Sequence, residues 1–230
     1  MKLSIIIPCY NESRNIREVL KRVNSVPISD REIIVVDDGS RDGTREILEE
    51  EVLPGIDKII YLPENRGKGA ALRSGFEAAS GDVLVVQDAD FEYDPRELPI
   101  LFKPITEGRA DVVYGSRFIP GKHFSAVSFR QVAANRFLTW MSNLLTGTRL
   151  TDMETCYKMF RREVIDAIEL EENRFGIEPE LTAKIARAGH PIVEVGISYS
   201  GRTGRQGKKI GWKDGISAVR ALFKYTVFQR

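Results

Sequence analysis

Residues 82–92 read DVLVVQDADFE, an apolar run that ends in two closely spaced carboxylates, Asp88 and Asp90. An unbroken run such as VLVV is typical of a strand buried on both faces of a sheet. Two carboxylates side by side at the end of a core strand would repel each other unless a cation joined them. The stretch therefore predicts a central strand of an α/β sheet, with a binding site at its carboxyl end.

Other strand-length apolar runs lie on both sides of this stretch and alternate with segments of helical period. Strands are expected over residues 3–7, 32–37, 58–62, 82–87 and 111–114, and helices over 13–24, 43–53, 68–79 and 95–106. Asp42 is predicted to cap the second helix, and Asp94-Pro95 to open the fourth. This alternation predicts a mostly parallel sheet with helices on both faces, which binds ligands beyond the carboxyl ends of its strands.

The second half of the chain is less regular. A Gly- and Ser-containing stretch at 120–128 precedes an amphipathic segment at 129–145, a helix at about 178–188 and a strand at 192–198. A Gly-rich basic segment at 201–209 leads into a final amphipathic helix from Trp212 onward. A chain of 230 residues, 42% hydrophobic, is expected to form one domain around one core.

Composition excludes several classes of function. The 34 basic and 33 acidic residues give a formal charge of +1, which offers no field for nucleic acid. Cys9 and Cys156 have no second Cys or His at metal-ligand spacing, so a reducing, cytoplasmic compartment is expected. We find no signal-peptide pattern and no apolar run of about 18 to 20 residues. Any contact with a membrane is therefore predicted to be peripheral, at its cytoplasmic face.

Polar side chains follow the first two predicted strands. Tyr10, Asn11 and Glu12 come after the first, and Asp37 and Asp38 after the second. Carboxylates at strand ends can accept hydrogen bonds from a base or a ribose, and an aromatic ring can stack on the base. Each residue alone is more often a helix cap or a turn residue. Their joint occurrence favours a nucleotide site.

The pair Asp88 and Asp90 predicts a metal site. Clustered anionic oxygens without His or Cys suit a hard cation, Mg²⁺ or Mn²⁺, which would neutralise a leaving diphosphate. A lone Asp-x-Asp is weak evidence, because turns also use Asp. Its place after a core strand makes the metal hypothesis stronger.

In order along the chain, these motifs resemble those of family 2 glycosyltransferases. They are Pro8-x-Tyr10-Asn11-Glu12, Val36-Asp37-Asp38-Gly39-Ser40, Asn65-x-Gly67-Lys68-Gly69 and Asp88-Ala89-Asp90. The later Gly115-Ser116-Arg117, Thr151-Asp152 and the basic segment are similar to the dolichyl- and polyprenyl-phosphate sugar synthases. The resemblance covers nearly the whole chain. It implies a single-domain GT-A fold with a Rossmann-like central sheet, residues 1–115 binding a nucleotide-sugar and 116–230 the acceptor.

The resemblance also implies roles for particular residues. Asp88, Asp90 and Glu92 would hold the metal, although relatives often have Gln at the position of Glu92. Asp90, Arg117 and Asp152 would be catalytic. Substrate contacts would come from the following residues: Pro8, Tyr10, Asn11, Glu12, Val36, Asp37, Asp38, Lys68, Asp88, Ala89, Arg117, Arg130, Arg202 and Lys208. Among these, Arg117, Arg130 and Arg202 would face phosphates, since the guanidinium fork suits bidentate contact.

The implied reaction moves a hexose from GDP-mannose or UDP-glucose to a polyprenyl or dolichyl phosphate, with inversion. A phosphomonoester has a second pKa of about 6 and is already an anionic nucleophile at neutral pH. Asp152 could therefore orient the sugar or stabilise ring charge instead of acting as a base. The segment Asp152-Met153-Glu154-Thr155-Cys156-Tyr157-Lys158 departs from the commoner Gly-Phe-Arg ending, which leaves the sugar open.

The basic segment and the two amphipathic segments each have two interpretations. Arg202, Arg205, Lys208, Lys209 and Lys213 place five positive charges within twelve residues. They could form a lid over a diphosphate or a solvated charge run. The apolar faces of residues 129–145 and of the last helix could rest on an anionic membrane or pack in the core. A membrane-anchored partner subunit is a further alternative.

Three functions remain open at this point. The first is transfer from a nucleotide-sugar to a polyprenyl phosphate. The second has the same donor but a soluble or polysaccharide acceptor. The third is a nucleotide-sugar-binding protein that does not turn over, and the intact Asp88, Asp90, Arg117 and Asp152 argue against it.

Overall fold

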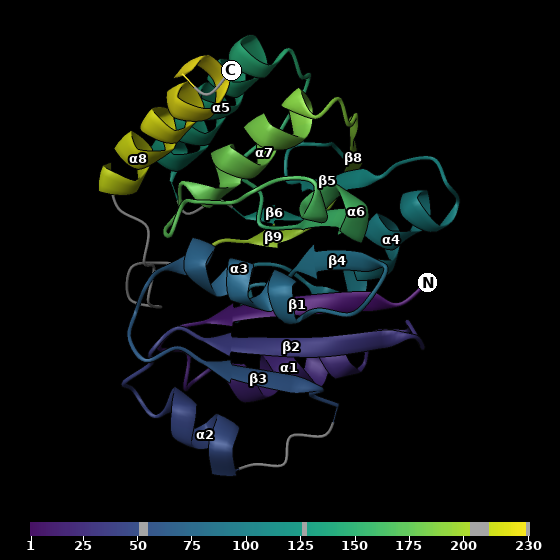
Figure 1. Ribbon diagram of the computed structural model, residues 1–230, viewed down its shortest axis with the longest axis vertical. Coiled ribbons are helices and arrows are strands. Elements are labelled where there is room, and N and C mark those ends of the chain that lie inside the picture. Colours follow the sequence, from purple (N-terminus) through teal and green to yellow (C-terminus); the bar gives the residue numbers. More distant parts are fainter. Residues whose placement is uncertain (51–54, 126–127, 203–211, 229–230) are drawn as a thin grey trace.

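A seven-stranded sheet organises the computed structural model, which describes residues 1–50, 55–125, 128–202 and 212–228 (Figure 1). Its strand order is β3-β2-β1-β4-β7-β5-β8, and β7 alone in this sheet runs antiparallel to its neighbours. The strands are β1 (Leu3–Cys9), β2 (Arg31–Asp37), β3 (Lys58–Tyr61), β4 (Val83–Val86), β5 (Val112–Ser116), β7 (Lys158–Arg161) and β8 (Ile192–Gly196). A two-stranded ribbon, β6 (Phe124–Ser125) with β9 (Tyr199–Ser200), lies apart from this sheet.

Helices cover both faces of the sheet. The first half supplies α1 (Ile16–Asn24), α2 (Thr44–Glu50), α3 (Lys68–Ala78), a 3-10 turn η1 (Pro95–Glu97) and α4 (Leu98–Thr106). The second half supplies α5 (Phe129–Thr146), α6 (Arg162–Asp166), α7 (Ile177–Arg187), α8 (Trp212–Phe223) and a π-helical turn η3 (Lys224–Phe228). Figure 1 shows α3 in front of the sheet and α1 behind it. Helices α5, α7 and α8 pack together at the top of the view, away from β3.

The predicted α/β architecture is confirmed. The five strands expected in the first half all form, within two residues of their expected bounds. Asp94 opens η1 by accepting a hydrogen bond from the backbone N–H of Arg96 at 3.0 Å. Asp42 accepts from the N–H of Thr44 at 3.1 Å, at the start of α2. The first helix begins at Ile16 and not at residue 13, because residues 13–15 form a turn that precedes it.

Strand β7 was not predicted. Its four residues, KMFR, begin and end in a charge, so they carry neither a long apolar run nor an alternating pattern. Lys158 nevertheless lies fully buried and is paired with Glu178. Because β7 runs antiparallel between β4 and β5, the loop that precedes it starts at the carboxyl edge of the parallel strands. Residues 151–157 therefore lie at the same edge as Asp88 and Asp90.

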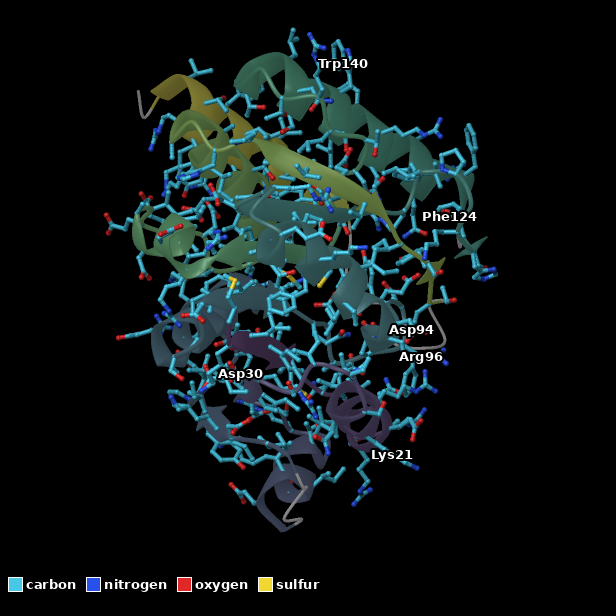
Figure 2. All side chains as sticks on the ribbon, turned by 90° about the vertical axis from the view of Figure 1, so that its right-hand side faces the viewer. Lys21, Asp30, Asp94, Arg96, Phe124 and Trp140 are labelled. Atoms are coloured by element: carbon cyan, nitrogen blue, oxygen red, sulfur yellow. The ribbon has the colours of Figure 1, made fainter. Side chains whose placement is uncertain are left out.

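Helix α5 buries one side and exposes another. Leu138 and Met141 belong to the core, whereas Phe129, Trp140 and Leu144 are 86%, 60% and 69% exposed. Trp140 lies at the outer end of the molecule in Figure 2, away from the sheet. None of the helices within the described residues is both long enough and apolar enough to span a bilayer.

Candidate functional site

A cavity of about 700 Å³ opens at the carboxyl edge of the sheet. Its walls come from the ends of β1, β2, β4 and β5, the loop before β7, and the inner sides of α5 and α8. This is the edge at which open α/β sheets bind ligands.

Most of the predicted site residues line this cavity. They are Pro8, Tyr10, Glu12, Asp38, Lys68, Asp88, Ala89, Asp90, Glu92, Arg117 and Arg202. Five others do not line it: Asn11, Val36, Asp37, Arg130 and Asp152. Lys208, with the rest of the basic segment beyond Arg202, lies outside the described residues.

Two predicted residues at the ends of β1 and β2 hold loops in place. Asn11 adopts the left-handed conformation, with φ of 49°, and its side chain accepts from the N–H of Arg41 at 2.8 Å. Asp37 is fully buried and accepts two hydrogen bonds from Arg45, at 3.0 and 2.9 Å. Both residues thus shape the rim around the cavity. Val36 is buried within β2.

Asp38 lines the cavity and also holds the loop that carries Asn65 and Gly67. Its carboxylate accepts hydrogen bonds at 2.8 Å from the Asn65 side chain and from the backbone N–H groups of Arg66 and Gly67. Burial nevertheless raises its pKa above the ordinary value, against these hydrogen bonds. Gly67 has φ of 100°, a conformation that suits glycine, and α3 starts directly after it.

Lys68 neutralises the first carboxylate of the Asp-x-Asp pair. Its ammonium lies 3.0 Å from Asp88 and 3.1 Å from Glu178. Burial alone would raise the pKa of Asp88, but the charge of Lys68, hydrogen bonds from Cys156 and Lys68 and the charge of Arg202 together outweigh it, and the pKa falls below the ordinary value. The first residue of α3 thus places a cation at the end of β4.

Arg202 neutralises the second carboxylate. Its guanidinium lies 2.5 Å from Asp90 and 3.1 Å from Glu12. Glu92 accepts from the backbone N–H of Arg202 at 2.9 Å and from the hydroxyl of Tyr199 at 3.0 Å. Burial, together with the neighbouring Asp88, raises the pKa of Asp90 to about 7 even though Arg202 opposes the shift. One arginine therefore bridges carboxylates from the ends of β1 and β4.

The oxygen donors fit a hard divalent cation in kind. Asp88 and Asp90 lie at the end of one strand, and the positively charged guanidinium of Arg202 contacts Asp90 directly. Among the described residues, no three His, Cys, Asp or Glu side chains converge as a ready-made cage. Magnesium commonly needs only one or two carboxylates when phosphate oxygens and water complete its shell. The site thus has the chemistry of a cation shared with a phosphorylated ligand.

Arg117 and Asp152 form a buried ion pair. Arg117 Nε and Nη2 donate to the two oxygens of Asp152 at 2.6 and 2.7 Å, and the backbone N–H of Arg117 donates at 3.0 Å. Asp152 is fully buried, while Arg117 lines the cavity and lies 5.0 Å from the centre of the Tyr199 ring. The carboxylate therefore orients the guanidinium. Arg130 is exposed on α5, outside the cavity.

Several cavity residues escaped the sequence reasoning. Glu154, Cys156, Glu178, Tyr93 and Tyr199 all line the cavity. Glu178 is the second residue of α7 and belongs to none of the quoted motifs, so only the packing of α7 reveals it. Glu154 lies in the segment whose sequence departs from the commoner pattern of the resembled family. That departure is the one sequence signal that could have pointed to it.

The fold and the cavity together define a class of protein. A mostly parallel sheet presents acidic strand ends and arginines around a cavity suited to a nucleotide or another phosphorylated ligand. The glycosyl transferase family 2 profile matches residues 4–169. The chain belongs to glycosyl transferase family 2.

Three of its relatives are named as mannose enzymes of polyprenyl phosphates. Polyprenol monophosphomannose synthase of Mycolicibacterium smegmatis is 32% identical over 206 residues, which cover 86% of this chain and 77% of that protein. Undecaprenyl-phosphate mannosyltransferase of Micrococcus luteus is 32% identical over 232 residues, which cover 95% and 92%. Dolichol-phosphate mannosyltransferase of Pyrococcus furiosus is 33% identical over 217 residues, but the match spans only 61% of that longer protein.

The solved structures confirm the GT-A fold. Glucosyl-3-phosphoglycerate synthase of Mycobacterium tuberculosis, in complex with Mn²⁺, UDP and glucosyl-3-phosphoglycerate, has a TM-score of 0.72 at 19% identity. That alignment covers 98% of this chain and 80% of the other. The same enzyme with Mg²⁺ and UDP also gives 0.72, at 20% identity, and covers 98% and 79%.

Proposed function

We propose that the protein transfers a hexose from a nucleotide-diphospho-sugar to a polyprenyl phosphate at a membrane surface, with inversion. The observation that carries the proposal is a single cavity lined by Asp88, Asp90 and Arg117 in a family 2 chain. The three curated relatives described above are all named as polyprenyl-phosphate mannose enzymes. Their names support a polyprenyl phosphate as the acceptor and favour mannose as the sugar.

The first half of the chain, residues 1–115, would bind the donor. Tyr10, Glu12 and Asp38 line the part of the cavity that meets β1 and β2, where a base and ribose would lie. Asp88 and Asp90 would hold Mg²⁺ or Mn²⁺, and such a cation supplies charge that stabilises the departing diphosphate. The Mn²⁺ and Mg²⁺ in the structural relative agree with this donor chemistry.

Arg117 would bind phosphate during transfer. Its guanidinium is permanently charged, lies at the cavity wall and is aligned by the two hydrogen bonds that it donates to Asp152. Asp152 already accepts three hydrogen bonds from Arg117 and is fully buried. This geometry favours a role for Asp152 as the residue that positions Arg117, with the acceptor phosphate itself as the nucleophile in an in-line displacement.

Arg202 would exchange partners when donor binds. It now neutralises Asp90 and Glu12, the positions at which the metal and the nucleotide are proposed to lie. Once those ligands bring their own charges, its guanidinium is free to face the diphosphate, as the resemblance implies. The remaining basic residues of that segment, Lys208 among them, are proposed to join it.

The apolar face of α5 supports a membrane acceptor. Phe137, Trp140 and Leu144 are at least half exposed, and Arg130 and Arg136 lie on the same helix. The inner side of this helix, including Gln131 and Leu138, lines the cavity. One helix therefore joins the active cavity to a surface suited to an anionic bilayer, so a lipid phosphate would not need to leave the membrane. Docking to a membrane-anchored partner subunit is the competing use of this face.

A donor and acceptor screen tests the proposal. Purified protein is mixed with Mg²⁺ or Mn²⁺, radiolabelled GDP-mannose or UDP-glucose, and a short polyprenyl phosphate, and label entering the organic phase is counted. We expect metal-dependent transfer with one donor, and loss of at least 100-fold in Asp90→Asn, since that residue meets the leaving diphosphate. Donor turnover at the same rate with and without the polyprenyl phosphate would instead support a soluble or polysaccharide acceptor. Donor binding without any turnover would make this a binding protein.

A further inference from the structure

The loop before β7 holds Glu154 rigidly at the cavity. Lys158, fully buried, donates to the carbonyl oxygens of Met153 and Thr155, at 2.9 and 2.5 Å, on either side of it. The backbone N–H of Met153 donates to Thr139 and that of Cys156 to Tyr93. Every neighbour of Glu154 is therefore anchored, and its side chain is presented from a fixed backbone.

One carboxylate oxygen of Glu154, Oε1, is buried and receives no hydrogen bond. Six buried side-chain oxygen or nitrogen atoms in the described part of the chain lack a hydrogen-bond partner, and Glu154 Oε1 is the one carboxylate oxygen among them. Lys158, the nearest buried cation along the chain, bonds to Glu178 and to backbone carbonyls instead. Leaving a buried acceptor unpaired is energetically costly, so such an atom in a cavity residue points to a ligand that supplies the donor.

The charges around the cavity decide what that donor can be. Among the cations that line the cavity, Lys68, Arg202 and Arg117 are paired with Asp88, Asp90 and Asp152, and these three cations are suited to phosphates. A carboxylate at Glu154 would repel a phosphate but accepts hydrogen bonds from hydroxyl groups. The remaining part of the ligand, once the nucleotide and its phosphates are placed, is the sugar.

We propose that Glu154 is a specificity-determining residue, whose carboxylate accepts hydrogen bonds from the hydroxyl groups of the transferred sugar. The inference rests on the proposed function, since it takes a nucleotide-sugar as the donor. A site built to bond a hydroxyl discriminates strongly against a sugar that lacks it, because the buried acceptor is then left unpaired. Glu154 would therefore select among hexoses that share one nucleotide.

Donor binding by calorimetry tests this without any acceptor. Wild type and Glu154→Gln are titrated, with Mn²⁺, against UDP, GDP, UDP-glucose, GDP-mannose and monodeoxy forms of the donor that wild type binds. We expect the variant to bind the free nucleoside diphosphate within twofold of wild type and the nucleotide-sugar at least tenfold more weakly. Removal of the hydroxyl that Glu154 bonds should weaken wild type by a similar factor and leave the variant unchanged.

A matched control separates recognition from folding. Glu32→Gln removes another buried carboxylate, one that lies at the opposite edge of the sheet and bonds to Ser4 and Ser80. It should lose stability yet keep the sugar preference of wild type. Equal weakening of diphosphate and nucleotide-sugar binding in Glu154→Gln, or an unchanged sugar preference, would overturn the inference.

The same titrations keep this inference apart from the proposed function. Sugar-dependent binding through Glu154 with no transfer to polyprenyl phosphate would refute the proposed acceptor and uphold Glu154. Wild type that binds none of the nucleotide-sugars would refute both.

Discussion

At the scale of single residues, the buried Glu32 and the half-buried Glu154 are in opposite electrostatic environments. Burial alone would raise the pKa of Glu32, but hydrogen bonds from Ser4, Ser80 and Lys2 outweigh it and lower the pKa to about 2. Burial raises the pKa of Glu154 to about 7, although the charge of Lys158 opposes the shift. The difference follows from partners, since one carboxylate is fully bonded and the other has an unpaired oxygen.

Glu32 should stabilise the protein at neutral pH and cease to do so in acid. Its folded pKa lies below the unfolded value, so its stabilisation is complete above about pH 4.5 and is lost as the pH falls towards 2. We expect Glu32→Gln to cost on the order of 2 kcal/mol at pH 7 and much less at pH 3. Urea unfolding of both proteins at the two pH values measures this. An equal loss at both would show that charge plays no part.

Glu154 should have the reverse effect. Its folded pKa lies above the unfolded value, so the carboxylate increasingly destabilises the fold as the pH rises from about 4.5 through 7. Glu154→Gln should therefore exceed wild type in free energy of unfolding by on the order of 1 to 3 kcal/mol at pH 8, and so melt at a higher temperature there, while the two proteins should melt at nearly the same temperature at pH 4.5. Thermal melts without ligand provide the measurement. A variant less stable than wild type at pH 8 would mean that Glu154 has an internal partner.

At the scale of elements, sequence reasoning succeeded where polar residues directly follow an apolar run. The ends of β1, β2 and β4 were predicted to share one edge, and Glu12, Asp38 and Asp90 indeed line one cavity. The parallel sheet makes such a prediction possible, because all its carboxyl ends meet at the same edge.

Strand β7 could not be predicted in the same way, and neither could the approach of Glu178 to the cavity, although helix α7 itself forms where the sequence predicts a helix at about 178–188. The pattern KMFR gives no strand signal, and only its place between β4 and β5 buries Lys158. The antiparallel direction of β7 then brings Glu154 to the cavity, and α7 adds Glu178. These are long-range packing effects, which local propensity does not encode.

Helix α5 carries a prediction about the membrane. Trp140→Ser together with Leu144→Ser should reduce binding to vesicles of anionic phospholipid by about tenfold or more, because two large exposed apolar groups are lost. Sedimentation of the protein with vesicles gives the measurement. Ile100→Ser, an exposed apolar residue on α4, is the control and should bind as wild type. If the double variant also binds as wild type, this face of α5 serves another partner.

At the scale of the whole molecule, the cavity joins the two halves of the chain. The ends of β1, β2 and β4 come from residues 1–115, whereas Glu154, Glu178 and Arg202 come from beyond them. Strand β7 inserts the second half directly into the sheet of the first, between β4 and β5. A ligand in this cavity would therefore contact both halves at once.

Ligand binding should consequently stabilise the entire fold in one transition. A nucleoside diphosphate with Mn²⁺ at about 100 times its dissociation constant adds about 2.7 kcal/mol, which for a domain of this size raises the melting temperature by roughly 5 to 10 °C. Differential scanning calorimetry should show one sharper peak moving upward, for UDP or GDP but not for both equally. Asp90→Asn should lose the part of the shift that depends on Mn²⁺, because the carboxylate proposed to hold the cation is gone. Two peaks, of which only one responds to the ligand, would instead show that the halves unfold independently and that the cavity belongs to one of them.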